Sequence, residues 1–152
     1  MPLRALLGKF TVWADNLTET DRGKAFRCPF CDDPLIAVLP KANIINHFRH
    51  KSGIEHGEPE TPEHLHGKTT MCDRFRRYGW HAEIEVKVGR SAFNIADIVA
   101  NKYMDIFAIE FQCSRISLDH FEQRNSRYEE LGLTPVWVLG NHYFANTSQF
   151  TD

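Results

Sequence analysis

The sequence predicts a mixed α/β protein in two parts: a small β-rich subdomain over residues 1–58, and a mixed sheet flanked by helices over residues 59–152. Hydrophobic residues make up 42% of the chain and charged residues 25%, which is globular composition and excludes a disordered or fibrous protein. The segment GIEHGEPETP, residues 53–62, is typical of a connecting loop. After it, hydrophobic periodicity follows the order helix, three strands, helix, strand.

The first part carries two short predicted strands, over residues 9–14 and 34–39, with turn residues between them. A segment of about 50 residues has little core of its own, so it needs an additional source of stability.

Two pairs of residues of the types that bind metal ions would provide this stability. Cys28 and Cys31 form a CxxC pair, and His47 and His50 follow at the same spacing, with 15 residues between Cys31 and His47. Two thiolates and two imidazoles form a closed tetrahedral zinc site, which predicts a zinc-ribbon-like subdomain. The alternatives are a reduced CxxC pair beside surface histidines, or another histidine as ligand: His56, His64 or His66.

The second part begins with a predicted helix. Thr61 is a suitable N-cap, Pro62 suits the first helical position, and Gly79 stops the helix after Tyr78. An apolar stripe on the core side consists of Leu65, Cys72 and Phe75.

Three strands, a second helix and a last strand complete the predicted order. Residues 81–88 alternate, with Ile84 and Val86 on one face and Glu83 and Glu85 on the other. Residues 93–100 and 104–112 are largely apolar, and residues 135–139 resemble a buried strand. Between them Ser117 caps a helix whose apolar face consists of Leu118, Phe121, Tyr128 and Leu131.

Two carboxylates interrupt these apolar strands. Asp97 lies in FNIADIVA and Glu110 in DIFAIEFQ, and a hairpin turning near residues 101–102 places them side by side. Gln112 shares the face of Glu110, two residues along the strand. Converging carboxylates form a hard oxygen site for Mg²⁺ or Mn²⁺, suited to phosphodiester hydrolysis. The alternative is a pair of structural acids neutralised by Arg115 or Arg124.

Charge and hydropathy limit the partners. The net charge of −2 argues against a broad, non-specific coat on DNA, although arginines and lysines cluster locally. No apolar run approaches the roughly 20 residues that cross a bilayer, so we expect a cytoplasmic protein without membrane contact.

Seven motifs occur in one order over about residues 25 to 140: CPFC, NHFRHK, EHLHGK, IADIV, AIEFQCSRIS, RNSRY and VWVLG. Together with the αβββαβ order and the D…ExQ arrangement, this chain resembles the PD-(D/E)XK nuclease superfamily, and within it the competence-protein CoiA-like family. The resemblance implies a restriction-endonuclease-like core.

The resemblance also implies roles for several residues. Asp97 and Glu110 correspond to metal ligands, and the backbone carbonyl of Phe111 completes the metal shell. Gln112 stands where the superfamily most often has a lysine, and Ala96 stands where its name-giving proline would be. An amide does not titrate near neutral pH, so Gln112 is expected to orient water or phosphate rather than act as a base.

The missing positive charge must come from another element. His64 and Lys68 match the family's EHxxxK pattern on the first helix, and Lys68 is the expected cation, with Lys87 and Arg124 the next candidates. Glu85, or else Glu63, is a further expected carboxylate; the alternative for Lys68 and Glu85 is a solvated surface residue.

These expectations describe a metal-dependent nuclease that processes DNA, incoming or foreign. The alternatives are a non-catalytic nucleic-acid-binding module that retains the fold, and a small metalloprotein that scaffolds protein partners. Cleavage of both strands of a duplex requires two active sites, so a homodimer is a further expectation.

Overall fold

The structure of the chain is a computed structural model that describes residues 2–40, 45–53, 61–89 and 94–140. Contacts between residues divide the chain into two compact units, Met1–Leu65 and His66–Asp152. The expected boundary between residues 58 and 59 lies outside the described residues. Within the described part of the chain, no helix is both long and apolar enough to span a membrane.

The N-terminal unit is built on a five-stranded antiparallel sheet with the order β2-β1-β3-β4-β5. The rings of Phe26 and Phe48 pack edge to face at its centre, with centroids 5.0 Å apart. Strands predicted over residues 9–14 and 34–39 correspond to β2 and β4, while β1, β3 and β5 were not anticipated. The strands are β1 (Arg4–Leu7), β2 (Phe10–Trp13), β3 (Phe26–Arg27), β4 (Pro34–Val38) and β5 (His47–His50).

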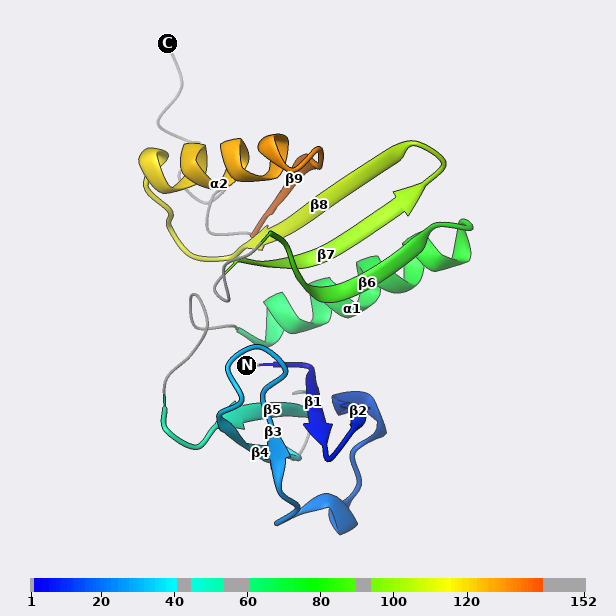
Figure 1. The fold of residues 1–152 in the computed structure, drawn as a ribbon, viewed down its shortest axis with the longest axis vertical. Helices are drawn as coiled ribbons and strands as arrows, with labels where there is room; N and C mark the ends of the chain where they lie inside the picture. The colour runs from blue at the N-terminus through cyan, green and yellow to red at the C-terminus, as the bar shows by residue number, and fades with distance from the viewer. Residues whose placement is uncertain (1, 41–44, 54–60, 90–93, 141–152) are drawn as a thin grey trace. The chain divides into compact units, whose positions relative to one another are not determined.

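The C-terminal unit contains a four-stranded mixed sheet with the order β6-β7-β8-β9. β6, β7 and β8 pair antiparallel, and β9 pairs parallel with β8. Figure 1 shows α1 running beside β6 and α2 beside β9. The predicted order of helix, three strands, helix and strand is confirmed. The elements are α1 (Pro62–Arg77), β6 (His81–Lys87), β7 (Ile95–Lys102), β8 (Asp105–Gln112), α2 (Leu118–Glu130) and β9 (Thr134–Leu139).

Both predicted helix starts have the expected local chemistry. The Thr61 hydroxyl accepts a hydrogen bond from the His64 amide at 3.2 Å, and the Ser117 hydroxyl accepts one from the His120 amide at 3.3 Å. Each bond satisfies a backbone donor that has no partner within its own helix. α1 ends at Arg77, and Gly79 follows in the left-handed region with φ +76°.

The predicted apolar face of α2 is only partly correct. Tyr128 is buried and Phe121 packs on Trp137 of β9 at 4.9 Å, but Leu118 is 68% exposed and Leu131 47% exposed. α2 therefore contacts the sheet through its centre, while both ends of the predicted stripe face solvent. Arg124 lies between Phe121 and Tyr128 in the sequence and shares their helix face.

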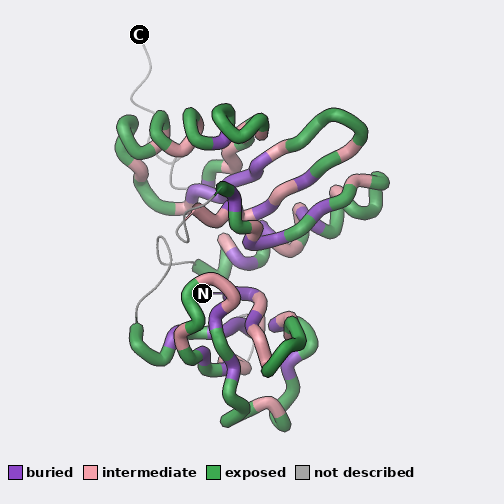
Figure 2. Tube along the Cα trace, in the orientation of Figure 1, coloured by how far each residue is buried: buried purple, intermediate pink, exposed green. Residues whose placement is uncertain are grey.

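Gly67 of α1 lies against the Phe111 ring of β8. A Cβ atom at this position would lie 2.7 Å from Cε1 of that ring, so a larger residue would require the ring to shift. The absence of a side chain therefore lets α1 pack closely on a side chain of the strand that carries Glu110. The next residue of the helix is Lys68, which is fully buried. In the C-terminal unit, β8 carries a continuous buried stretch over its second half, residues 108–112 (Figure 2).

Candidate functional site

Three carboxylate residues occupy one row across the C-terminal sheet. Ile84 of β6 pairs with Ile98 of β7, which pairs with Ile109 of β8. In antiparallel strands the neighbours of paired residues also face each other, so Asp97 of β7 and Glu110 of β8 lie opposite each other. Glu85 occupies the corresponding position along the neighbouring strand β6. The hairpin of β7 and β8 thus brings Asp97 beside Glu110, as the sequence suggests.

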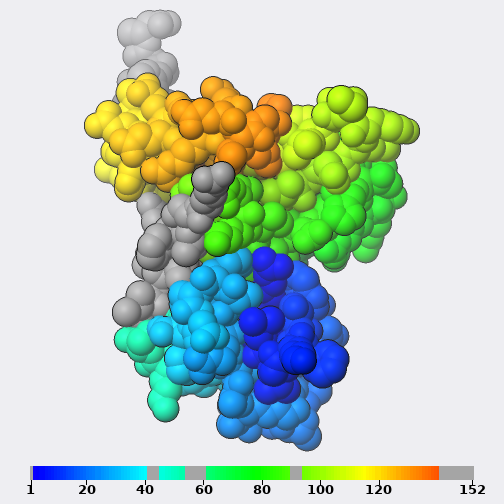
Figure 3. Space-filling view, viewed as in Figure 1, coloured from blue at the N-terminus to red at the C-terminus, as the bar shows by residue number. Residues whose placement is uncertain are grey.

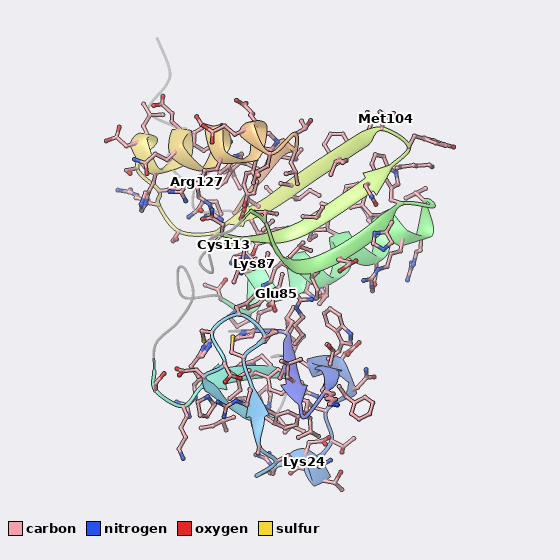
Figure 4. All side chains as sticks on the ribbon, viewed as in Figure 1. Lys24, Glu85, Lys87, Met104, Cys113 and Arg127 are labelled. Carbon is pink, nitrogen blue, oxygen red and sulfur yellow. The ribbon has the colours of Figure 1, made fainter. Side chains whose placement is uncertain are left out.

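Glu85 does not follow the alternation of its strand. A regular strand would place it on the exposed face with Glu83, yet it is only 5% exposed. Its φ of +54° is the reason, because a left-handed residue interrupts the pleat and redirects the side chain. The expectation that Glu85 faces away from the apolar side of β6 is therefore wrong (Figure 4). A non-glycine residue in this conformation carries strain that the surrounding contacts must offset.

Lys68 of α1 reaches this row from the helix side. Its Nζ lies 3.0 Å from Oε1 of Glu85 and 3.8 Å from Oδ1 of Asp97. The lysine is completely buried, which excludes the alternative of a solvated helix lysine. Gly67 makes this reach possible because it lets the helix backbone lie against β8.

Asp97 and Glu110 are held by different partners. Oδ2 of Asp97 accepts a hydrogen bond from the Phe111 amide at 2.8 Å. Oε2 of Glu110 forms an ion pair with Arg124 at 2.6 Å, and Oε1 accepts a hydrogen bond from the Tyr128 hydroxyl. Of the two arginines considered from sequence, Arg124 is the partner and Arg115 is exposed.

Sequence reasoning assigned Tyr128 only to the hydrophobic face of α2. Its hydroxyl was not anticipated as a partner of Glu110, although its spacing offers a signal. Tyr128 lies four residues after Arg124, one helical turn away, so both side chains meet the same strand.

The row carries more negative than positive charge. Three carboxylates face two cations, Lys68 and Arg124, within a buried site. Burial and the adjacent Asp97 raise the pKa of Glu110 to about 8, although Arg124 and Tyr128 oppose the rise. Burial and the Glu110 carboxylate also raise the pKa of Tyr128. A divalent cation beside these carboxylates would supply the missing positive charge.

The remaining predicted residues occupy other positions. Gln112 is buried, and its amide donates to the Ser114 carbonyl at 2.8 Å and to the Ser114 hydroxyl at 3.1 Å. His64 is half-buried and Glu63 exposed in the first turn of α1, before the division between the units. The roles of Gln112 and His64 stay predictions.

In the N-terminal unit, Cys28, Cys31 and His50 form a candidate metal centre. Their ligand atoms all lie within 4.8 Å of one another. Sγ of Cys31 and Nε2 of His50 are 3.6 Å apart, which is about the edge of a tetrahedron with Zn–S and Zn–N bonds of roughly 2.3 and 2.0 Å. This donor set fits Zn²⁺.

Backbone geometry arranges the two cysteines. The Phe30 amide donates to Sγ of Cys28 at 3.5 Å, and the Cys28 amide donates to the Asp33 carbonyl at 2.8 Å. Asp32 closes the turn with φ +63°. Burial raises the pKa of the Cys28 thiol to about 11, so the thiol requires a cation beside it before it loses its proton.

His47 is not part of this group, contrary to the predicted set of four ligands. His47 and His50 lie three residues apart on β5, and an odd separation directs side chains to opposite faces of a strand. Nδ1 of His47 instead contacts the Ile45 carbonyl at 3.0 Å. The group contains neither His64 nor His66, and His56 lies outside the described residues.

A mixed sheet flanked by helices, with a row of acids on three adjacent strands, defines an α/β protein with an acidic candidate site. Residues 60–151 match the family model described as "Competence protein CoiA, nuclease-like domain". Because this match covers more than half of the chain, the chain belongs to that family. No solved structure matches.

The chain is also similar to a curated relative, "Competence protein CoiA" of Bacillus subtilis (strain 168). The two are 29% identical over 119 residues, which is 77% of this chain and 32% of the relative. The chain thus spans about a third of the length of that relative.

The zinc site generates a prediction that separates the two histidines. Protein purified in reducing buffer without chelators should retain zinc, measured by elemental analysis. Cys28→Ser and His50→Gln should lose most of it, because each removes a ligand from the group. His47→Gln is the matched control and should retain zinc. Equal loss from both histidine variants would contradict the three-residue assignment.

The Lys68 contacts generate a second prediction. Lys68→Met should lower the free energy of unfolding by about 3–5 kcal/mol, because it leaves the buried Glu85 carboxylate and the adjacent Asp97 carboxylate without their cation. Adding Glu85→Gln to that variant should recover part of the loss. Arg74→Met, at an exposed position of the same helix, should change stability by no more than about 0.5 kcal/mol. Urea unfolding measures all four proteins, and equal stabilities for the two single variants would contradict the burial argument.

Proposed function

We propose that the chain is a divalent-metal-dependent nuclease of the PD-(D/E)XK type that hydrolyses phosphodiester bonds in DNA. The observation that carries the proposal is the pair of Asp97, which is 14% exposed, and the buried Glu110 on adjacent strands, with Lys68 Nζ 3.8 Å from Asp97. Acids removed from water cost several kcal/mol to desolvate. With Glu85, three carboxylates face two cations, so one negative charge is unbalanced. Mg²⁺ or Mn²⁺ provides that charge balance.

Three groups would hold the metal. The carboxylates of Asp97 and Glu110 and the backbone carbonyl of Phe111 offer hard oxygen donors of the kind that Mg²⁺ and Mn²⁺ prefer. The Phe111 amide already fixes Asp97 at 2.8 Å, so one residue links the aspartate to the strand that carries Glu110. When bound, the metal supplies charge stabilisation at the phosphate and a lower pKa for water.

The side chains supply the rest of the chemistry. In the hydrolysis, water adds its hydroxyl to phosphorus, the bond from phosphorus to the leaving oxygen breaks, and that oxygen takes up the proton from water. Lys68 stabilises negative charge developing on the phosphate, because its ammonium already faces the acid row. Glu85 holds Lys68 in place, and Gln112 orients water or phosphate from β8.

A second candidate function has one specific observation in its favour. Both oxygens of Glu110 contact α2, through Arg124 and Tyr128, as in a purely structural ion pair. A non-catalytic nucleic-acid-binding module would keep these contacts and lack metal chemistry.

The N-terminal unit is proposed to be a zinc-ribbon-like subdomain in which Zn²⁺ on Cys28, Cys31 and His50 stabilises a small sheet. The biological setting proposed is processing of incoming or foreign DNA, because the curated relative is named a competence protein. Cleavage of duplex DNA would further call for a homodimer that presents two sites.

The proposal predicts the behaviour of two isosteric variants. Asp97→Asn and Glu110→Gln should lower the cleavage rate in Mg²⁺ or Mn²⁺ by about 10²-fold or more, because each removes an anionic ligand while keeping hydrogen-bonding atoms. Labelled single-stranded, duplex and branched DNA and RNA, tested in parallel, provide the assay. Glu83→Gln, an exposed acid on β6, is the control and should cleave at the wild-type rate.

The outcomes separate the two candidate functions. Metal-dependent cleavage lost in both variants supports the nuclease. Salt-dependent DNA binding by wild-type protein without cleavage in either metal supports the non-catalytic module.

A further inference from the structure

Arg124 is placed differently from the other arginines of the C-terminal unit. It projects from the centre of α2, the helix on the outside of this unit in Figure 3, toward the carboxylate of Glu110 at 2.6 Å. Its side chain nevertheless remains 32% exposed. The guanidinium therefore touches the acid row and reaches solvent at the same time.

The guanidinium is also held in orientation. It lies over the Trp137 ring, 5.3 Å from the ring centroid. Trp137 is itself fixed, because its indole nitrogen donates to Oδ1 of Asn125 at 2.7 Å and its ring packs on Phe121. A planar cation between a carboxylate and an aromatic ring has little freedom left to lose when it binds a ligand.

We propose that Arg124 binds a non-bridging oxygen of the DNA phosphate at the acid row. This inference rests on the proposed nuclease function and assigns the phosphate contact on the α2 side. Lys68 approaches the row next to Glu85 and Asp97, and Arg124 approaches it next to Glu110, so the two cations flank the acid pair. A guanidinium carries several N–H donors in a fork that matches phosphate geometry, and one ion pair does not use them all.

Substrate binding exchanges one anion for another at this arginine. In the free protein Glu110 is its partner, and a divalent cation held by the Asp97 and Glu110 carboxylates would weaken that attraction. The guanidinium then pairs with the phosphate from nearly the same position, held by Trp137. Tyr128 keeps its hydrogen bond to Glu110 and so holds the Glu110 carboxylate in its orientation.

Arg127 provides a matched control on the same helix. It is exposed, and its guanidinium donates to Oδ1 of Asn94 at 3.1 Å rather than to the acid row (Figure 4). Replacing it removes the same charge from α2 without touching Glu110 or Trp137.

The test compares the wild-type chain of residues 1–152 with Arg124→Gln, Arg124→Lys and Arg127→Gln. Fluorescence anisotropy with a short labelled DNA duplex in Ca²⁺ measures affinity across salt concentrations. Arg124→Gln should lower the slope of log affinity against log salt by about 0.9, the loss of one phosphate contact. Arg124→Lys should keep that slope, since the charge remains. Arg127→Gln should leave affinity at the wild-type level.

Cleavage and stability measurements complete the test. In Mg²⁺ or Mn²⁺, kcat/KM should fall about 10²–10³-fold for Arg124→Gln and recover in part for Arg124→Lys. A lower melting temperature for Arg124→Gln, with unchanged affinity and salt slope, would show a structural ion pair and overturn the proposal. So would a wild-type chain that does not bind the duplex. Wild-type protein that binds through Arg124 but cleaves nothing removes the nuclease function and leaves the phosphate contact intact.

Discussion

Three carboxylates side by side, two of them buried, are the constraint on which the C-terminal unit depends. Adjacent strands bring Glu85, Asp97 and Glu110 within one row, where desolvation and mutual repulsion both favour the neutral form. The fold places a cation at each end of that row, Lys68 from α1 and Arg124 from α2. Each helix position follows from this need: glycine at position 67 allows α1 to lie against β8, and the centre of α2 faces Glu110.

The charges of the carboxylates and the two cations do not cancel, and this imbalance favours binding of a further cation. A purely structural cluster gains most stability when charges cancel, whereas here three carboxylates face two cations. Sites that bind divalent cations share this excess of negative charge, because the bound cation supplies the missing positive charge. The family membership of the chain agrees with a nuclease-like site of this kind.

The features that depend on regular patterns could be predicted from sequence. Caps at Thr61 and Ser117, the order of elements, and the proximity of Asp97 to Glu110 all follow from periodicity and turn chemistry. The left-handed backbone at Glu85 could not, because strand alternation assumes a regular pleat. The contact from Tyr128 was missed because an aromatic residue on an apolar stripe is normally core.

The ligands of the metal centre were also only partly predictable from the sequence. The CxxC and HxxH pairs have equal spacing, which suggested four equivalent ligands, but the same spacing places side chains differently on a turn and on a strand. The cysteines lie on a turn, where two intervening residues bring both sulfur atoms together. The histidines lie on strand β5, where the same spacing separates His47 from His50. Correct ligand assignment therefore required knowledge of the strand.

The central claim is that the acid row is a divalent-cation site. Crystals of the protein soaked in Mn²⁺ and measured near the manganese absorption edge test it directly. The account predicts an anomalous peak between the carboxylates of Asp97 and Glu110 and the Phe111 carbonyl, with Lys68 retained beside Asp97. A soaked crystal with Mn²⁺ bound elsewhere on the protein, and with Glu110 still paired to Arg124 and no peak at the row, would contradict it.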